Sequence, residues 1–206
     1  MFKLNDPLND YVTINDEEHP IYMAFDNVMN ALETFDDQEL SEADRLYIFL
    51  GIMLHDYDQE LISTLNFETQ VDVGKQIIDR INSEPIENQP VDLEGNPMPQ
   101  PKRDGEQLAS FLFDAKYIYA AFMQSYGIDL IEQQGSLHWS KFSALLNALP
   151  DNTLMRQIID IRKTDLSEIK DKDEKKRIKK LKQQFSLEGK GSPDEEGGDM
   201  YGWWNS

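Results

Sequence analysis

The chain has 206 residues, which suits one domain, or one domain with appendages, and is long enough to bury a real core. With 39% hydrophobic and 29% charged residues, its composition is globular rather than disordered. The absence of cysteine excludes disulfides, thiolate zinc sites and a cysteine nucleophile. The N-terminal residues show no signal pattern, and the longest apolar run, Leu46–Leu54, is far shorter than the roughly 20 residues that span a bilayer. We therefore expect no membrane association.

The net charge of −19 is unevenly distributed along the chain. Residues 1–100 hold 22 acidic and four basic side chains, whereas residues 101–206 hold 17 acidic and 16 basic ones. Within the second half, residues 156–182 carry 11 basic and six acidic side chains. The acidic half opposes nucleic-acid binding, because it repels phosphates, and it favours solubility and a basic partner.

The first 54 residues predict a short strand and two helices. Residues 8–14 mix apolar residues with turn formers and acids, which suits a short strand or an ordered arm. Apolar residues at three- and four-residue steps predict a helix over 21–35. They are Phe25, Val28, Met29, Leu32 and Phe35. Ser41 opens a second helix in a capping-box-like pattern, with Asp44 in place of the usual Glu or Gln. The apolar run that follows predicts a centrally buried helix.

A third helix is predicted over residues 69–82, with one apolar face made of Val73, Ile77, Ile78 and Ile81. Residues 84–105 then contain five prolines and two glycines, which disfavour regular structure. At about 20 residues, this stretch is too long for an ordinary loop. We take it as the boundary between two helical subdomains.

The second half predicts four more elements. A helix capped by Asp114 ends at Gly127, which suits a left-handed C-terminal residue. A second helix covers 136–148, and a third is capped by Asp151 or Asn152. A charged helix over 171–185 has only a thin apolar seam and should lie on the surface. The seam consists of Ile178, Leu181 and Phe185.

Together these elements predict an all-α fold of six to seven helices, with a short N-terminal strand. The predicted divisions are an acidic helical subdomain at 1–83, a proline-rich linker at 84–105, a C-terminal helical subdomain at 106–187, and a disordered acidic and aromatic tail at 188–206. The expected core is Phe25, Leu32, Leu46, Phe49, Ile77, Tyr117, Phe122, Trp139, Phe142, Leu145 and Ile158.

Three segments of the second half resemble one known family. They are YIYAAFMQSYGIDL at 117–130, LHWSKFSALLNALP at 137–150, and IIDIRKTDLSEIKDKDEKKRIKKLKQQFSL at 158–187. They are similar to the "gene product fifteen" family of phages of Gram-positive bacteria, which shows a comparable aromatic helix, a Trp-containing segment, and an R-x-x-DL stretch before a Lys-rich helix. Ser140 departs from the pattern, because the family usually has a second Trp there. Residues 20–60 agree with the family only in layout.

The resemblance implies a tail assembly chaperone. Such a chaperone binds the amphipathic helices of the tape-measure protein, helps the tail tube protein to assemble around it, and is absent from the mature virion. It would act in the host cytoplasm, without catalysis, cofactor or metal. We expect a target helix to lie in a groove lined by aromatic residues. The candidate partner-binding residues are Tyr117, Tyr119, Phe122, Trp139, Phe142, Trp203 and Trp204.

No residue pattern indicates catalysis or metal binding. The three histidines have no metal-ligand spacing, and we expect His138 to be a hydrogen-bonded structural residue rather than a ligand. Asp56, Asp58 and Glu60 alternate as in calcium loops but lack the central glycine and the terminal glutamate. A solvated helix end fits that cluster better. Phosphate-binding, dinucleotide-binding and hydrolase motifs do not occur.

Other readings remain open for three features. The basic helix near 170–182 could contact nucleic acid, or it could pair with the acidic half of a neighbouring copy in a head-to-tail homo-oligomer. The pair Trp203 and Trp204 could bind a partner, dock on its own domain, or remain a free terminus. For the whole chain, the alternatives are a structural tail or head–tail component of the virion, and a small nucleic-acid-binding regulator.

Overall fold

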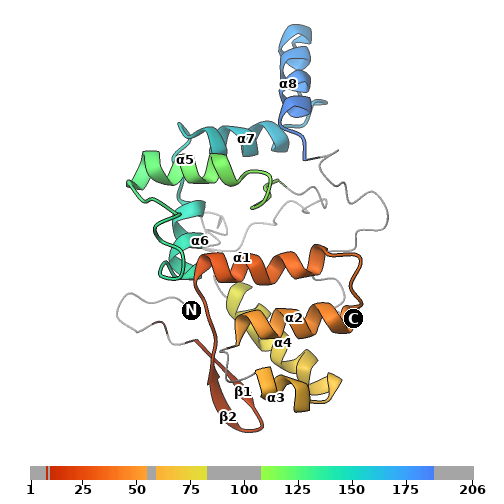
Figure 1. The fold of residues 1–206 in the computed structure, drawn as a ribbon. Coiled ribbons are helices and arrows are strands. Elements are labelled where there is room, and N and C mark those ends of the chain that lie inside the picture. Colours follow the sequence, from red (N-terminus) through yellow and green to blue (C-terminus); the bar gives the residue numbers. More distant parts are fainter. Residues whose placement is uncertain (1–7, 9, 55–58, 83–107, 188–206) are drawn as a thin grey trace, which may run out of the picture. The chain divides into compact units, whose positions relative to one another are not determined.

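The computed structural model describes residues 8, 10–54, 59–82 and 108–187 (Figure 1). These residues form eight α-helices and one two-stranded sheet, which confirms a mostly helical fold with a short N-terminal strand. The chain divides into two compact units. The first unit comprises Met1–Glu87 and Ile131–Asn147, and the second comprises Asn88–Leu130 and Ala148–Ser206. Among the described helices, none is long and apolar enough to cross a membrane.

The first unit begins with a β-hairpin. Strand β1 (Tyr11–Ile14) pairs antiparallel with β2 (Glu17–Pro20), and the two turn residues, Asn15 and Asp16, both have positive φ, as a tight hairpin turn requires. The β1 side chains Val12 and Ile14 are buried. The Gln76 side-chain amide accepts from the Thr13 N–H at 2.9 Å and donates to the Thr13 carbonyl at 3.0 Å. These bonds fasten the hairpin to the helix that carries Gln76.

The helices of the first unit are α1 (Phe25–Glu33), α2 (Glu42–Met53), α3 (Gln59–Thr64), α4 (Phe67–Asn82) and α6 (Trp139–Asn147). A 3-10 turn, η1 (Thr34–Asp36), follows α1. Helix α1 starts at Phe25 rather than at the predicted residue 21, because Ile21 and Ala24 form β-bridges to Leu54 and His138. The helix α3 was not predicted.

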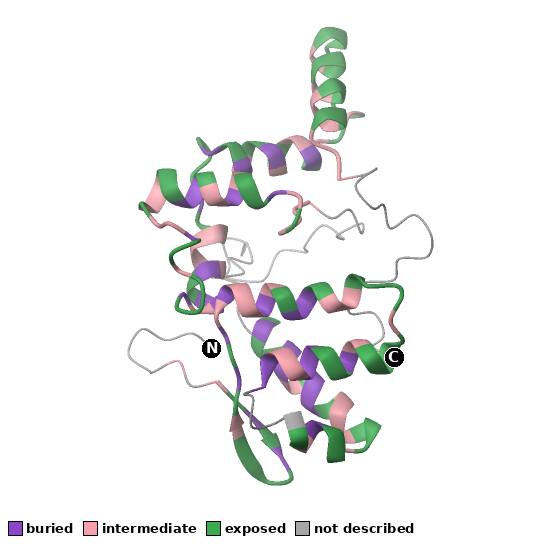
Figure 2. Cartoon of the chain, viewed as in Figure 1, coloured by how far each residue is buried: buried purple, intermediate pink, exposed green. Residues whose placement is uncertain are grey.

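Helix α2 begins where its cap predicts and is buried only on one side. The Ser41 hydroxyl oxygen accepts from the Asp44 N–H at 3.2 Å, which confirms the capping pattern. The buried face consists of Leu46, Phe49, Leu50 and Met53. Tyr47 and Ile48, on the other side, are 44% and 36% exposed. Both buried and exposed residues occur along α2 (Figure 2). The prediction of a centrally buried helix therefore holds for one face only, because α1 and α4 cover only part of the helix surface.

The second unit contains α5 (Ala115–Tyr126), α7 (Leu154–Lys163) and α8 (Lys172–Gln184). Gly127 ends α5 with φ of 65°, as predicted. The cap of α7 is Thr153, not Asp151 or Asn152, because its hydroxyl accepts from the Arg156 N–H at 3.4 Å. Helix α8 buries no side chain, and its seam of Ile178, Leu181 and Phe185 is half-buried, which confirms a surface helix.

The observed division differs from the predicted one at residues 131–147, which belong to the first unit. The segment before α6 is hydrogen-bonded to the segment before α1: the Phe25 N–H donates to the Leu137 carbonyl, and the Trp139 N–H to the Met23 carbonyl. The Phe25 and Phe142 rings stack with centroids 5.0 Å apart. These contacts link positions more than a hundred residues apart, so local sequence did not predict them.

Most of the expected core residues are buried; Tyr117 and Leu145 are the two that are only half-buried. The four predicted apolar residues of α4 are all buried. The predicted linker at 84–105 and the predicted tail at 188–206 lie outside the described residues.

Candidate functional site

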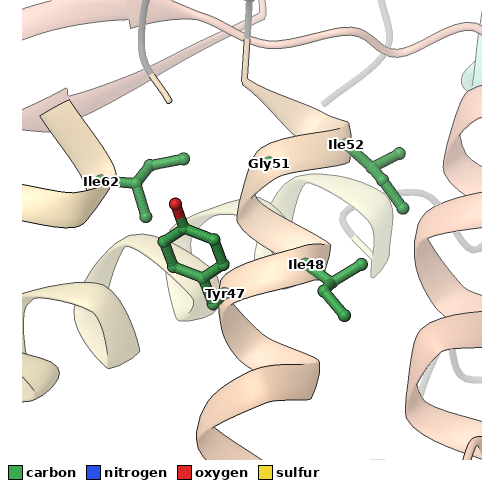
Figure 3. A pocket seen from close by; sticks show the side chains of 5 residues that line it. All are labelled: Tyr47, Ile48, Gly51, Ile52 and Ile62. Atoms are coloured by element: carbon green, nitrogen blue, oxygen red, sulfur yellow. The ribbon is translucent and has the colours of Figure 1, made fainter. Parts of the chain in front are cut away.

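An apolar hollow lies on the exposed side of α2 in the first unit (Figure 3). We call it the α2 hollow, and its lining residues are Tyr47, Ile48, Gly51, Ile52 and Ile62. Tyr47 and Ile62 stand on one side of Gly51, and Ile48 and Ile52 on the other (Figure 3). Four of the five residues come from α2, and Ile62 comes from α3.

The spacing of the α2 residues produces this shape. Residues four apart are neighbours on a helix surface, so Tyr47 lies beside Gly51, and Ile48 beside Ile52. Gly51 has no side chain, and a Cβ built there meets nothing within 4 Å. A glycine inside a helix costs about 1 kcal/mol relative to alanine. Gly51 is therefore not required by a close contact within the described structure; its effect is to leave the hollow open.

The α2 hollow is open to solvent and has a volume of about 260 Å³. Pockets for small molecules usually measure about 300–1,000 Å³ and bury most of their ligand. Tyr47 and Ile48, in contrast, are exposed, and the hollow has no charged lining residue. Its size and apolar lining suit one or two side chains of a docking helix better than a small molecule.

The unit that carries the α2 hollow is acidic. Asp44 is exposed on α2, about one turn before Tyr47 and Ile48, and Glu60 is exposed on α3 close to Ile62 in sequence. The described part of the first unit contains 16 acidic and four basic side chains, a net charge of −12. An apolar contact inside an acidic field favours a partner that combines apolar side chains with lysine or arginine.

A buried ion pair organises the second unit. The Arg162 guanidinium donates from Nη1 to Asp114 Oδ2 at 2.6 Å and from Nη2 to Asp114 Oδ1 at 2.8 Å. It also donates to the Phe185 carbonyl at 2.8 Å and to the Leu108 carbonyl at 2.9 Å. Arg162 thus joins the start of α5, the end of α7 and the end of α8. A two-point bond to a carboxylate of this kind is strong and directional.

This ion pair was not predicted from the sequence, which indicated instead that Asp114 caps the helix that follows it. Asp114 does precede α5, but its carboxylate makes no cap to that helix; instead it accepts from Arg162 and from the Ser110 N–H at 2.9 Å. A signal was present, because Arg162 is the arginine of the R-x-x-DL stretch. Side chains of Arg162 and Asp114 are 8% and 1% exposed, so the pair is structural.

His138 is held on both ring nitrogens in the first unit. Its Nδ1 accepts from the Ser140 N–H at 3.1 Å, and its Nε2 lies 2.5 Å from Asp10 Oδ2. With Nδ1 accepting, the proton on Nε2 donates to the carboxylate. The structure gives His138 the hydrogen-bonded environment of a structural residue. Among the described residues, no group of three or more metal-ligating side chains occurs. Glu60 begins α3, whereas Asp56 and Asp58 lie outside the described residues.

The predicted partner-binding residues do not come together as one exposed aromatic surface. Phe122 and Phe142 are fully buried, and Trp139 is 7% exposed with its indole N–H donating to the Ile81 carbonyl at 3.0 Å. Tyr117 and Tyr119 are half-buried. Tyr117, Tyr119 and Phe122 belong to the second unit, whereas Trp139 and Phe142 belong to the first.

Two further contacts of these aromatic residues lie within the second unit. The Tyr119 hydroxyl donates to Asp129 at 3.0 Å, and the Tyr117 ring meets the edge of Phe185 with centroids 6.1 Å apart. Both contacts lie within the second unit, so they stabilise that unit. Trp203 and Trp204 lie outside the described residues. The α2 hollow, in contrast, is an exposed apolar site in the acidic N-terminal half, and it was not predicted from the sequence.

Comparison with known proteins supplies the family. The model of the family described as "Bacteriophage Gp15 protein" matches residues 4–187, nearly the whole chain. No curated protein and no solved structure gave a significant match. The match covers both units, including the N-terminal half in which the sequence resembled the family only in layout. The chain therefore belongs to the Bacteriophage Gp15 protein family, and is a phage protein of virion structure or assembly.

Proposed function

We propose that this protein is a non-enzymatic tail assembly chaperone that binds the tape-measure protein of its phage in the host cytoplasm. The observation that supports this function best is the α2 hollow, an apolar site exposed on an acidic helical unit. Family membership supports the phage context. The function requires neither a cofactor nor a metal.

The proposed mechanism follows from the chemistry of the α2 hollow. An amphipathic helix of the tape-measure protein would place one or two apolar side chains between Tyr47 and Ile48, over Gly51. The exposed carboxylates of the first unit would keep the complex soluble, because negatively charged complexes repel one another. Long, apolar-striped helices would thereby be prevented from aggregating until tail tube protein assembles around them.

Co-expression with the tape-measure protein tests the proposal. We expect this chain to keep the tape-measure protein soluble and to be recovered with it in a pull-down. The variant Ile48→Asp should weaken recovery, because it puts a charge beside the α2 hollow. Leu154→Asp is the matched control, since Leu154 is an exposed apolar helix residue of the second unit, 48% exposed. Equal recovery with both variants would remove the α2 hollow from the mechanism.

Mass spectrometry of purified virions separates this function from its main alternative. A chaperone leaves the finished tail, so its peptides should be absent from particles and present in infected-cell lysate. A constant number of copies per particle would make the protein a structural tail or head–tail component. A tape-measure protein that stays insoluble during co-expression would also favour the structural component over the chaperone.

A further inference from the structure

Helix α8 contributes no buried side chain to the core of the second unit. It carries seven basic and two acidic side chains over Lys172–Gln184, and none of its side chains is buried (Figure 2). The positive charge is concentrated on the exposed residues: Lys172, Lys175, Lys176, Arg177, Lys179 and Lys180. An isolated helix of this length is only marginally stable in water. The contacts that α8 makes at one end are therefore important for its stability.

Within the described residues, two hydrogen bonds join the C-terminal end of α8 to α7 and to the residue after it. Arg162 donates to the Phe185 carbonyl, and the Lys182 ammonium donates to the Thr164 carbonyl at 2.7 Å. Nearer the middle of α8, Ile178 and Leu181 are half-buried and lie three residues apart, hence on one face. Lys175 is on the same face, one turn before Ile178. The helix therefore presents a short apolar seam flanked by lysine.

We infer that α8 of a second copy of this chain docks in the α2 hollow. The two surfaces match in chemistry. One is an apolar hollow with room for one or two side chains, in a unit whose described residues carry a net charge of −12. The other is an Ile–Leu seam on a helix of net charge +5. Asp44 and Glu60 are the described carboxylates closest in sequence to the lining residues, and they meet lysines such as Lys175 in this arrangement. Opposite charges of this kind fix the register and accelerate association.

The geometry of the contact determines the kind of oligomer. Each chain carries one α2 hollow and one α8, so the contact joins different surfaces of two copies and leaves an unused surface at each end of a dimer. Such head-to-tail contacts close into rings or extend as filaments. Docking also covers the exposed Tyr47 and Ile48, which protects the apolar site from unspecific contacts.

Occupation by α8 also regulates the proposed site. An incoming tape-measure helix displaces α8, so the chaperone exchanges self-association for its partner. This regulatory step rests on the proposed function, whereas the self-association does not. The attraction between the two surfaces is electrostatic at the rim, and it is therefore reduced by salt, whose screening length is about 10 Å at 0.1 M and about 3 Å at 1 M.

Sedimentation velocity of the purified full chain tests the inference. The chain should self-associate at low salt and dissociate as salt is raised. Two single variants should each raise the dissociation constant at least about tenfold, a loss of about 1.4 kcal/mol. Ile178→Asp removes the seam, and Gly51→Leu fills the α2 hollow at a position where an added Cβ meets no atom within 4 Å. Leu112→Asp, at a residue 64% exposed on the second unit, is the control and should associate like the wild type.

Mixing the two variants gives the decisive result. Ile178→Asp retains an intact α2 hollow, and Gly51→Leu retains an intact α8, so the mixture should form a dimer of one copy of each and nothing larger. Circular dichroism and melting of each variant alone establish that both are folded. A wild type that is monomeric at low salt overturns the inference, as does a mixture of folded variants that stays monomeric. Variants that associate as strongly as the wild type also overturn it.

The two proposals fail separately. A monomeric chain that still keeps the tape-measure protein soluble overturns the α8 inference and leaves the chaperone function in place. A chain that self-associates through α8 and leaves the tape-measure protein insoluble overturns the chaperone function alone.

Discussion

Arg162 and Asp114 form a two-point buried ion pair, with guanidinium-to-carboxylate distances of 2.6 and 2.8 Å across 48 residues of sequence. Three further bonds surround it, to the carbonyls of Leu108 and Phe185 and from the N–H of Ser110. Buried charges of this kind are costly to desolvate and are tolerated only when all their bonds are made. The pair therefore makes the packing of α5, α7 and α8 specific, since a different arrangement would leave a charge without a partner.

Removing the arginine should destabilise the second unit strongly. In Arg162→Met, the carboxylate of Asp114 stays buried without its counterion, and the free energy of unfolding should fall by about 3–5 kcal/mol. Urea unfolding followed by circular dichroism measures the loss. Arg177→Met is the matched control: Arg177 makes a two-point bond to Glu174 at 2.9 and 2.6 Å, but on the exposed surface of α8. Similar losses in both variants would contradict the role of burial.

Truncating Phe142 should damage the core of the first unit. Its ring is fully buried between Phe25 and Trp139, with centroid distances of 5.0 and 5.7 Å. Phe142→Ala should lower the free energy of unfolding by about 3–5 kcal/mol, because the cavity is lined by rigid rings. Thermal melting measures the change, and Leu112→Ala, at an exposed site, should melt like the wild type. A stable Phe142→Ala protein that has lost only partner binding would instead restore Phe142 to the binding surface.

The cap of α2 should be worth a measurable amount. Ser41→Ala removes the hydroxyl that accepts from the Asp44 N–H, and we expect a loss of about 1 kcal/mol in the free energy of unfolding. Ser41→Thr is the control, because a threonine hydroxyl can accept the same bond and donate to the Asp44 carboxylate as serine does, so it should keep most of the stability. Urea unfolding curves for the three proteins provide the comparison. If alanine and threonine behave alike, the cap does not contribute.

The carboxyl of Asp36 should make stability depend on pH. Asp36 is exposed, but partial desolvation of its carboxyl raises its pKa above the ordinary value of 3.8, and the opposing attraction of Arg45 is smaller. The folded state therefore binds this proton more tightly than the unfolded state does, so the stabilising contribution is present at low pH and is lost as pH rises through the raised pKa. Asp36→Asn should consequently melt higher than the wild type at neutral pH.

The advantage of Asp36→Asn should shrink as the pH is lowered towards 3.8, where the wild-type carboxyl becomes protonated in both states. Paired melting curves across that range measure it. Asp37→Asn, at the next position, is the control for the general effect of removing one negative charge. An advantage that is the same at every pH, or the same in both variants, would show that the desolvation of the Asp36 carboxyl is not its cause.

Local patterns in the sequence predicted most of the helices, because their causes are local. The four-residue spacing on α4, the Ser41 cap and the left-handed Gly127 each involve residues within a few positions of one another. The resemblance to the family rested on contiguous segments for the same reason. The sequence predicted the α2 hollow only in part. The apolar run of α2 was evident, but the side of the helix that its neighbours leave exposed depends on tertiary packing.

The sequence by itself determined the helical class, most helix positions, the acidic first half with a basic final helix, and the family. The tertiary structure decided that residues 131–147 complete the first unit, through bonds such as Trp139 to the Ile81 carbonyl. It also decided that Arg162 pairs with Asp114. The physical reason is the same in each case: these contacts join residues distant in sequence, and many pairings of equal chemical quality exist along the chain until the packing of the helices selects one.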